Sequence, residues 1–126
     1  MKSKVGLWID HRKAVIVSLR DSGEEIREIL SHMEKHVRYS GGAQETSAED
    51  QRDMRFAGHL NKYYERIVSC IHDADAILIL GPGEAKVEFK TRLEGEALGG
   101  RITGVETVDK MTERQLVARV RQHFSQ

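Results

Sequence analysis

The feature that most constrains the fold is a short, uninterrupted apolar run in the second half of the chain. Residues Ala76 to Leu80 read A-I-L-I-L, and Gly81-Pro82-Gly83 ends the run abruptly. A half-exposed strand alternates apolar and polar residues, whereas a continuous apolar run suits a strand that is covered on both faces. The sequence therefore predicts a buried strand over residues 76–80, within a sheet that carries helices on its faces.

Antiparallel strands are predicted at the start of the chain. The apolar run from Val5 breaks at H-R-K and resumes as A-V-I-V-S-L, which predicts a hairpin of two strands over about 4–9 and 13–20. A second turn signal, D-S-G, precedes a loosely alternating stretch from Glu24 to Glu34. We interpret this stretch as a half-exposed third strand, with a helix as the alternative. The sole tryptophan, Trp8, is expected in the core.

Amphipathic helices are predicted on either side of the buried strand. Before it, apolar residues recur at steps of three and four from about residue 48 to Ile71, which marks one face of a long helix. After it, the stretch Glu84–Leu98 is typical of a second helix, with Val87 among its candidate packing residues. Gly99 and Gly100 are the expected stop of that helix.

One more strand and one more helix are predicted at the end of the chain. The strand is Arg101–Val108, and Thr112 with Gln115 fits a capping box at the start of the helix. The resulting element order is βββαβαβα. Strands that alternate with helices pair in parallel through right-handed crossovers, so we expect an α/β fold with one mixed five-stranded sheet.

Length and composition set the broad class of protein. The 126 residues suit one domain, 1–126, with a proper core. Lys and Arg total 20, as do Asp and Glu, so the net charge does not exclude a nucleic-acid partner. No secretory pattern and no run of about 18 apolar residues is present, so we expect a cytoplasmic chain without membrane contact. The one cysteine, Cys70, is interpreted as a small core residue.

The sequence predicts neither a metal nor a cofactor. The six histidines form no H-x-x-x-H pair on a clear helix, and a second cysteine for a zinc site is lacking. Gly81-Pro82-Gly83 has neither the P-loop lysine nor the dinucleotide glycine spacing, so a tight turn is favoured over nucleotide binding. Asp10 is a lone carboxylate at a strand end, whereas metal-dependent nucleases need several converging acids.

A polar, glycine-rich loop is the strongest candidate for function. It reads H-V-R-Y-S-G-G-A-Q-E-T-S from His36 to Ser47, between the third strand and the long helix. Basic and aromatic residues precede its two glycines, and arginines follow the loop, which favours phosphate contacts and base stacking on RNA. The plain alternative is a connector between a strand and a helix. The candidate RNA-binding residues are Lys35, His36, Arg38, Tyr39, Arg52, Arg55 and Lys86.

The order of these motifs resembles the central domain of the archaeal and eukaryotic peptide-chain release factors and of Pelota, the ribosome-rescue protein. The resemblance rests on V-G-L-W-I-D-H-R-K-A-V-I-V, on the loop H-V-R-Y-S-G-G-A-Q, on the helix from R-F-A-G-H-L to Y-Y-E-R-I, and on I-L-I-L-G-P-G-E-A-K-V-E-F. It implies a ribonuclease H-like sheet, in agreement with the element order. It also implies the ribosome or another structured RNA as the partner, and the 126 residues leave no room for the family's other domains.

The same resemblance draws attention to a glutamine in the loop. In the release factors a Gly-Gly-Gln tripeptide enters the peptidyl-transferase centre and positions water against the peptidyl-tRNA ester. This chain reads Gly41-Gly42-Ala43-Gln44, with an alanine between the second glycine and the glutamine. The insertion moves Gln44 by about 3.5 Å along an extended chain, and catalysis by positioning is sensitive to about 1 Å.

Three functional hypotheses follow. The first is a non-catalytic module that binds the ribosome or RNA. The second is a peptidyl-tRNA esterase in which Gln44 orients water, while Gly41 and Gly42 permit the backbone geometry. The third is an interaction protein that lost RNA binding and forms a homodimer through exposed Ile and Leu residues on the edge strand.

Overall fold

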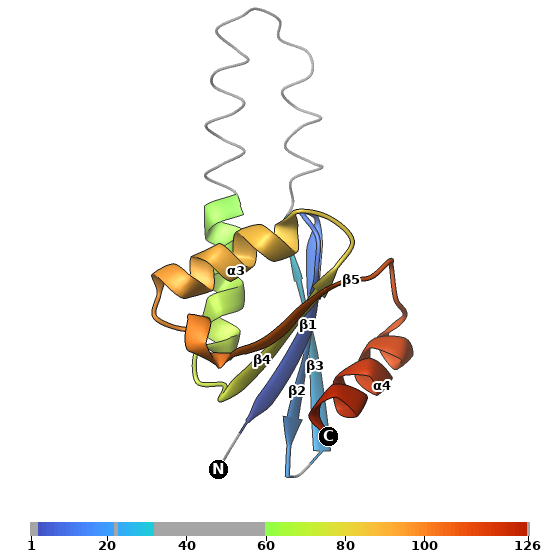
Figure 1. Ribbon diagram of the computed structural model, residues 1–126. Coiled ribbons are helices and arrows are strands. Elements are labelled where there is room, and N and C mark those ends of the chain that lie inside the picture. Colours follow the sequence, from blue (N-terminus) through green and yellow to red (C-terminus); the bar gives the residue numbers. More distant parts are fainter. Residues whose placement is uncertain (1–2, 22, 32–59, 126) are drawn as a thin grey trace, which may run out of the picture.

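The buried strand expected from the apolar run is β4, Ala76–Gly81, and it lies inside a mixed five-stranded sheet. The computed structural model describes residues 3–21, 23–31 and 60–125 (Figure 1). Strand β4 pairs in parallel with β1, Lys4–Ile9, and with β5, Ile102–Thr107. The antiparallel strands β2, Lys13–Arg20, and β3, Gly23–Leu30, complete the order β3-β2-β1-β4-β5. The predicted sheet is thereby confirmed.

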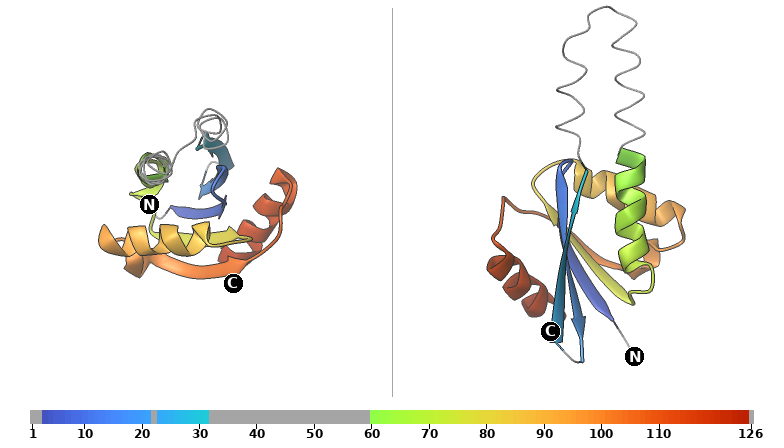
Figure 2. Two further views of the ribbon diagram at one scale, coloured as in Figure 1. Left: turned by 90° about the horizontal axis from the view of Figure 1, so that it is seen from above. Right: turned by 180° about the vertical axis from the view of Figure 1, so that it is seen from behind.

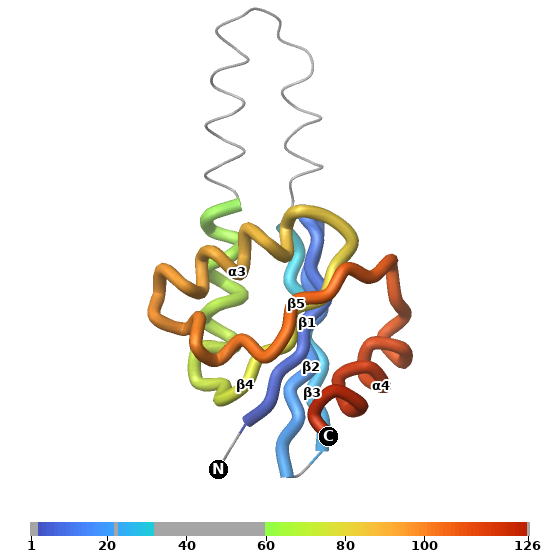
Figure 3. Tube along the Cα trace, in the orientation of Figure 1, coloured from blue at the N-terminus to red at the C-terminus, as the bar shows by residue number. Residues whose placement is uncertain are grey.

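Helices cover both faces of this sheet (Figure 2). The helix over residues 60–71 and α3, Ala85–Gly95, lie on one face, and α4, Glu113–Phe124, lies on the other. The chain runs from β4 through α3 and the short 3₁₀ helix η1, Gly99–Arg101, back to β5 (Figure 3). The order βββαβαβα is as predicted. The part of the long helix that was predicted before residue 60 lies outside the described residues.

Two apolar clusters hold these layers together. Under the 60–71 helix and α3, the cluster includes the fully buried side chains of Ile67, Ile77 and Phe89. Under α4, Trp8 packs with Leu80 and other apolar residues, and its indole N–H donates to the Asp109 carbonyl at 3.1 Å. Strands β1 and β4 contribute to both clusters, which explains their continuous apolar sequences.

Helix α3 ends earlier than the sequence predicted. It stops at Gly95 rather than Leu98, and Ala97 takes a left-handed conformation with φ of +63°. The Leu98 N–H donates to the Leu93 carbonyl at 2.8 Å, and the Ala97 N–H to the Glu94 carbonyl at 3.3 Å. These two bonds form a Schellman motif, in which glycine normally takes the left-handed position. The predicted helix end falls too late in the sequence because an alanine, and not a glycine, occupies the left-handed position here.

Two smaller expectations also need correction. Val87, a predicted packing residue of α3, is 52% exposed. Cys70 is only partly buried at the edge of the larger cluster, where its Sγ accepts a long hydrogen bond from Arg27 at 3.5 Å.

The left-handed alanine leads to a stability prediction. Replacing Ala97 with Gly should raise the free energy of unfolding by about 1 kcal/mol, because a left-handed conformation costs a residue with a Cβ about 1–2 kcal/mol. Urea denaturation followed by circular dichroism measures the difference. The matched control is Ala118→Gly in the middle of α4, where glycine should lower stability by about 1 kcal/mol. Equal destabilisation by both substitutions would contradict this account of the helix end.

Candidate functional site

The segment 32–59, which carries most of the candidate functional residues, joins the described part of the chain at Ser31 and at residue 60. Ser31 is only 2% exposed. Its N–H donates to the Arg12 carbonyl at 2.8 Å, and its hydroxyl donates to the His11 carbonyl at 2.7 Å. The end of β3 is therefore fastened to the turn between β1 and β2.

Asp10 builds that turn. One of its carboxylate oxygens accepts hydrogen bonds from the N–H groups of Arg12 and Lys13, both at 2.8 Å. The Asp10 N–H donates to the Lys13 carbonyl at 3.0 Å. This is a local turn in which an aspartate side chain replaces backbone partners, so Asp10 has a structural task in the hairpin.

Two adjacent tyrosines fasten the 60–71 helix to the same end of the sheet. The hydroxyl of Tyr63 donates to the Asp10 carbonyl at 2.9 Å, and that of Tyr64 donates to Glu88 Oε1 at 2.7 Å. His11 Nε2 lies 3.0 Å from the same Glu88 oxygen. Glu88 thus links the helix, α3 and the β1–β2 turn.

Burial raises the pKa of both phenols far above the ordinary value for tyrosine. The negative charge of Asp10 adds to the effect on the pKa of Tyr63, and the hydrogen bond to Glu88 adds to the effect on the pKa of Tyr64. Both hydroxyls therefore stay protonated and remain donors throughout the physiological pH range.

The turn Gly81-Pro82-Gly83 connects β4 to α3 at this end of the sheet. A methyl group on Gly81 would lie 2.3 Å from the Ile9 carbonyl oxygen, so glycine is required for the close approach of β1 and β4. The Lys86 ammonium donates to the Gly83 carbonyl at 2.6 Å, and the Lys86 side chain is buried. A tight turn that is closed by a lysine agrees with the plain interpretation of this motif.

The predicted site residues divide into two groups. Lys86 is the one RNA-binding candidate within the described ranges, and its burial leaves the ammonium turned to the backbone; contact with a phosphate would require it to leave Gly83. All other candidates lie outside the described residues, so their roles stay predictions. They are the loop residues Gly41, Gly42 and Gln44 and the RNA-binding candidates Lys35, His36, Arg38, Tyr39, Arg52 and Arg55.

The sequence analysis missed the two tyrosine anchors. Tyr64 belonged to the apolar face of the predicted helix, but no pattern indicated which polar groups its hydroxyl would meet. Glu88 and Asp10 come from other elements, and only the fold brings them to the helix. The pair Y-Y within the predicted amphipathic helix was the one local signal.

Within residues 3–21, 23–31 and 60–125, no group of three or more His, Cys, Asp and Glu side chains converges as a metal site. No helix in this part of the chain is long and apolar enough to cross a membrane.

Comparison with known proteins identifies the fold. No family model matches the chain, and no curated protein sequence is similar to it. Among solved structures, Pelota from Archaeoglobus fulgidus superposes over 97% of this chain at 18% identity, with a TM-score of 0.59. The archaeal translation termination factor aRF1 superposes over 95% of this chain at 16% identity, with a TM-score of 0.62. Pelota from Thermoplasma acidophilum superposes over 96% of this chain at 18% identity, with a TM-score of 0.54.

These similarities concern one part of each larger protein. The chain corresponds to 31% of the first structure, 34% of the second and 32% of the third, which is about a third of each. At such identities the likeness establishes a shared fold. The chain therefore has the ribonuclease H-like fold of one domain of Pelota and of the termination factor.

The tyrosine anchors lead to a prediction about stability. Tyr64→Phe should lower the free energy of unfolding by about 1 kcal/mol, because it removes one hydrogen bond to a carboxylate that retains His11 nearby. Tyr63→Phe should cost a similar amount. The control is Thr91→Val, which removes an exposed hydroxyl that bonds within α3 and should be nearly neutral. If all three variants unfold at the same urea concentration as the wild type, the anchors do not stabilise the fold.

Proposed function

We propose that this chain is a non-catalytic module that binds RNA, with the ribosome as its partner. The observation that carries the proposal is the fastening of Ser31 and of the 60–71 helix to one end of the sheet. The residues on either side of the segment 32–59 are therefore held at fixed positions on the sheet. That segment supplies the predicted phosphate contacts Lys35, Arg38, Arg52 and Arg55, and the glycine loop between them.

The shared fold supports the same proposal, since one of the similar structures is a translation termination factor. Binding without hydrolysis is favoured over esterase activity because Ala43 shifts Gln44 out of the Gly-Gly-Gln register. A release assay with peptidyl-tRNA on ribosomes separates the two. The esterase alternative requires turnover that Gln44→Ala abolishes while binding persists.

Co-sedimentation with intact ribosomes tests the proposed partner. The chain should pellet with ribosomes at near-physiological salt despite an excess of unrelated RNA. Arg38→Ala should weaken binding and reduce the slope of log affinity against log salt by about 1, because one phosphate contact is lost. Arg114→Ala, an exposed arginine on α4, removes the same charge elsewhere and should leave both unchanged. A wild-type chain that stays in the supernatant would contradict the proposed function.

A homodimer is the second candidate, and a specific surface favours it. Strand β3 lies at one edge of the sheet, and its Ile26 and Leu30 side chains are 39% and 46% exposed. Edge strands with exposed apolar residues tend to pair with other strands. In this candidate function, two copies would associate through β3.

Light scattering coupled to size-exclusion chromatography tests this candidate. The chain should elute as a dimer at high concentration, and Ile26→Lys should make it monomeric because a charge would be placed at the pairing edge. Val87→Lys is the control, since Val87 is equally apolar and 52% exposed but lies on α3. A monomer at every concentration would exclude the dimer.

A further inference from the structure

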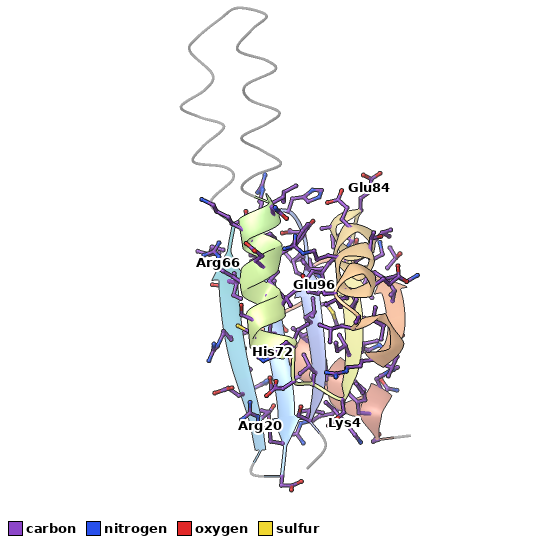
Figure 4. All side chains as sticks on the ribbon, turned by 90° about the vertical axis from the view of Figure 1, so that its left-hand side faces the viewer. Lys4, Arg20, Arg66, His72, Glu84 and Glu96 are labelled. Atoms are coloured by element: carbon purple, nitrogen blue, oxygen red, sulfur yellow. The ribbon has the colours of Figure 1, made fainter. Side chains whose placement is uncertain are left out.

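A wide groove separates the 60–71 helix from the C-terminal half of α3. Its volume is about 1310 Å³. It is lined by Lys62 and Arg66 on the helix, by His72 just after the helix, by Arg92 and Gly95 on α3 and by Glu96 just after α3, among others. Figure 4 shows Glu96 between the 60–71 helix and α3, His72 at the end of that helix, and Arg66 on the side of the helix nearer β3, at the outer rim of the groove. Lys62, on its helix wall, lies two residues after Leu60, the first residue described after the segment 32–59.

The two carboxylates among the described lining residues, Glu65 and Glu96, share one cation. Arg92 Nε donates to Glu96 at 2.8 Å, and another nitrogen of the same guanidinium lies 3.9 Å from Glu65. Arg92 also donates to Asn61 on the helix. The Arg92 side chain is only 23% exposed, so it forms a bridge between the two walls rather than a free cation.

The other two cations of the groove have no carboxylate partner among the described residues. Lys62 is exposed and takes part in no ion pair there. The Arg66 guanidinium donates to the Leu30 carbonyl at 2.7 Å, which fixes its position without neutralising its charge. Because Arg92 already meets Glu65 and Glu96, the described part of the groove keeps uncompensated positive charge.

The spacing of these cations suits a phosphate chain. Lys62 and Arg66 are four residues apart on a helix, which places them on one side at about 6 Å along the axis. That is close to the separation of successive phosphates in a nucleic-acid strand. Among the residues that the structure describes, the lining contains no Phe, Tyr or Trp on which bases could stack. A ligand would therefore be held through its backbone and without sequence preference.

We propose that this groove binds the sugar–phosphate backbone of single-stranded RNA. Lys62 and Arg66 contact phosphates, and Arg92 acts as a positioning residue that keeps Glu65 and Glu96 from repelling them. A concave groove between two helices admits one strand rather than a duplex. This inference rests on the proposed function and extends the RNA contact from the segment 32–59 onto the folded body.

Fluorescence anisotropy with a labelled twelve-residue oligouridine tests the groove. Lys62→Ala and Arg66→Gln should each weaken binding about fivefold and reduce the salt slope by about 0.7, the value for one phosphate of a single strand. Lys110→Ala, an exposed lysine outside the groove, should change neither. A duplex of the same length should bind more weakly; equal binding of the duplex would overturn the single-strand assignment.

The masking role of Arg92 gives a second, independent test. Arg92→Met keeps the aliphatic stem but frees both glutamates, so affinity should fall about fivefold although Arg92 contacts no phosphate in this account. Adding Glu65→Gln and Glu96→Gln should restore it. In the wild-type chain, Glu65→Gln and Glu96→Gln together should raise the affinity for oligouridine. The Glu65 and Glu96 side chains are 63% and 40% exposed, so replacing both with glutamine should leave the fold intact. This double variant therefore tests the masking role even if Arg92→Met is unstable.

The outcomes separate this inference from the proposed function. If the wild type pellets with ribosomes but the groove variants bind RNA as it does, the groove is not a phosphate site and the proposed function stands. If the wild type binds neither ribosomes nor oligouridine, both fail. If glutamine at positions 65 and 96 leaves affinity unchanged, the masking role of Arg92 is wrong.

Discussion

The parallel pairing of β1 with β4 is the constraint on which the rest of the structure depends. Their register runs from Lys4 opposite Ala76 to Trp8 opposite Leu80, and joins segments far apart in the sequence. From Val5 to Ile9 and from Ile77 to Gly81 every residue is buried. Two strands that are apolar on both faces need a helical layer on each side, and the 60–71 helix, α3 and α4 supply these layers. The close approach also requires glycine at position 81.

The same pairing brings the functional candidates to one end of the sheet. Strands β1 and β4 are parallel, so their carboxyl ends lie side by side and place the Asp10 turn near the start of α3. Tyr63 and Tyr64 then tie the 60–71 helix to both. The helix and α3 consequently lie next to each other, and both contribute residues to the open groove that Lys62 and Arg66 line. The fold, the position of the 60–71 helix and the proposed RNA contact thus all follow from the pairing of β1 with β4.

Much of the fold was predictable because hydrophobic periodicity is local. The A-I-L-I-L run, the opening hairpin and the capping box of Thr112 and Gln115 were all found where expected. The end of α3 was not, because its left-handed residue is Ala97 and carries no glycine signal. The groove could not be predicted either, since its ion pair joins Glu65 to Arg92 across two helices. The catalytic and RNA-binding roles in the segment 32–59 remain predictions.

Hydrogen–deuterium exchange of the chain, alone and bound to ribosomes, tests the central claim most directly. The account predicts slower exchange on binding in peptides that cover the segment 32–59, the 60–71 helix and the C-terminal half of α3. Peptides from α4, on the opposite face of the sheet, should exchange at the same rate in both samples. Protection confined to α4 and β5, with no change at the 60–71 helix, would contradict the account and assign RNA contact to the other face.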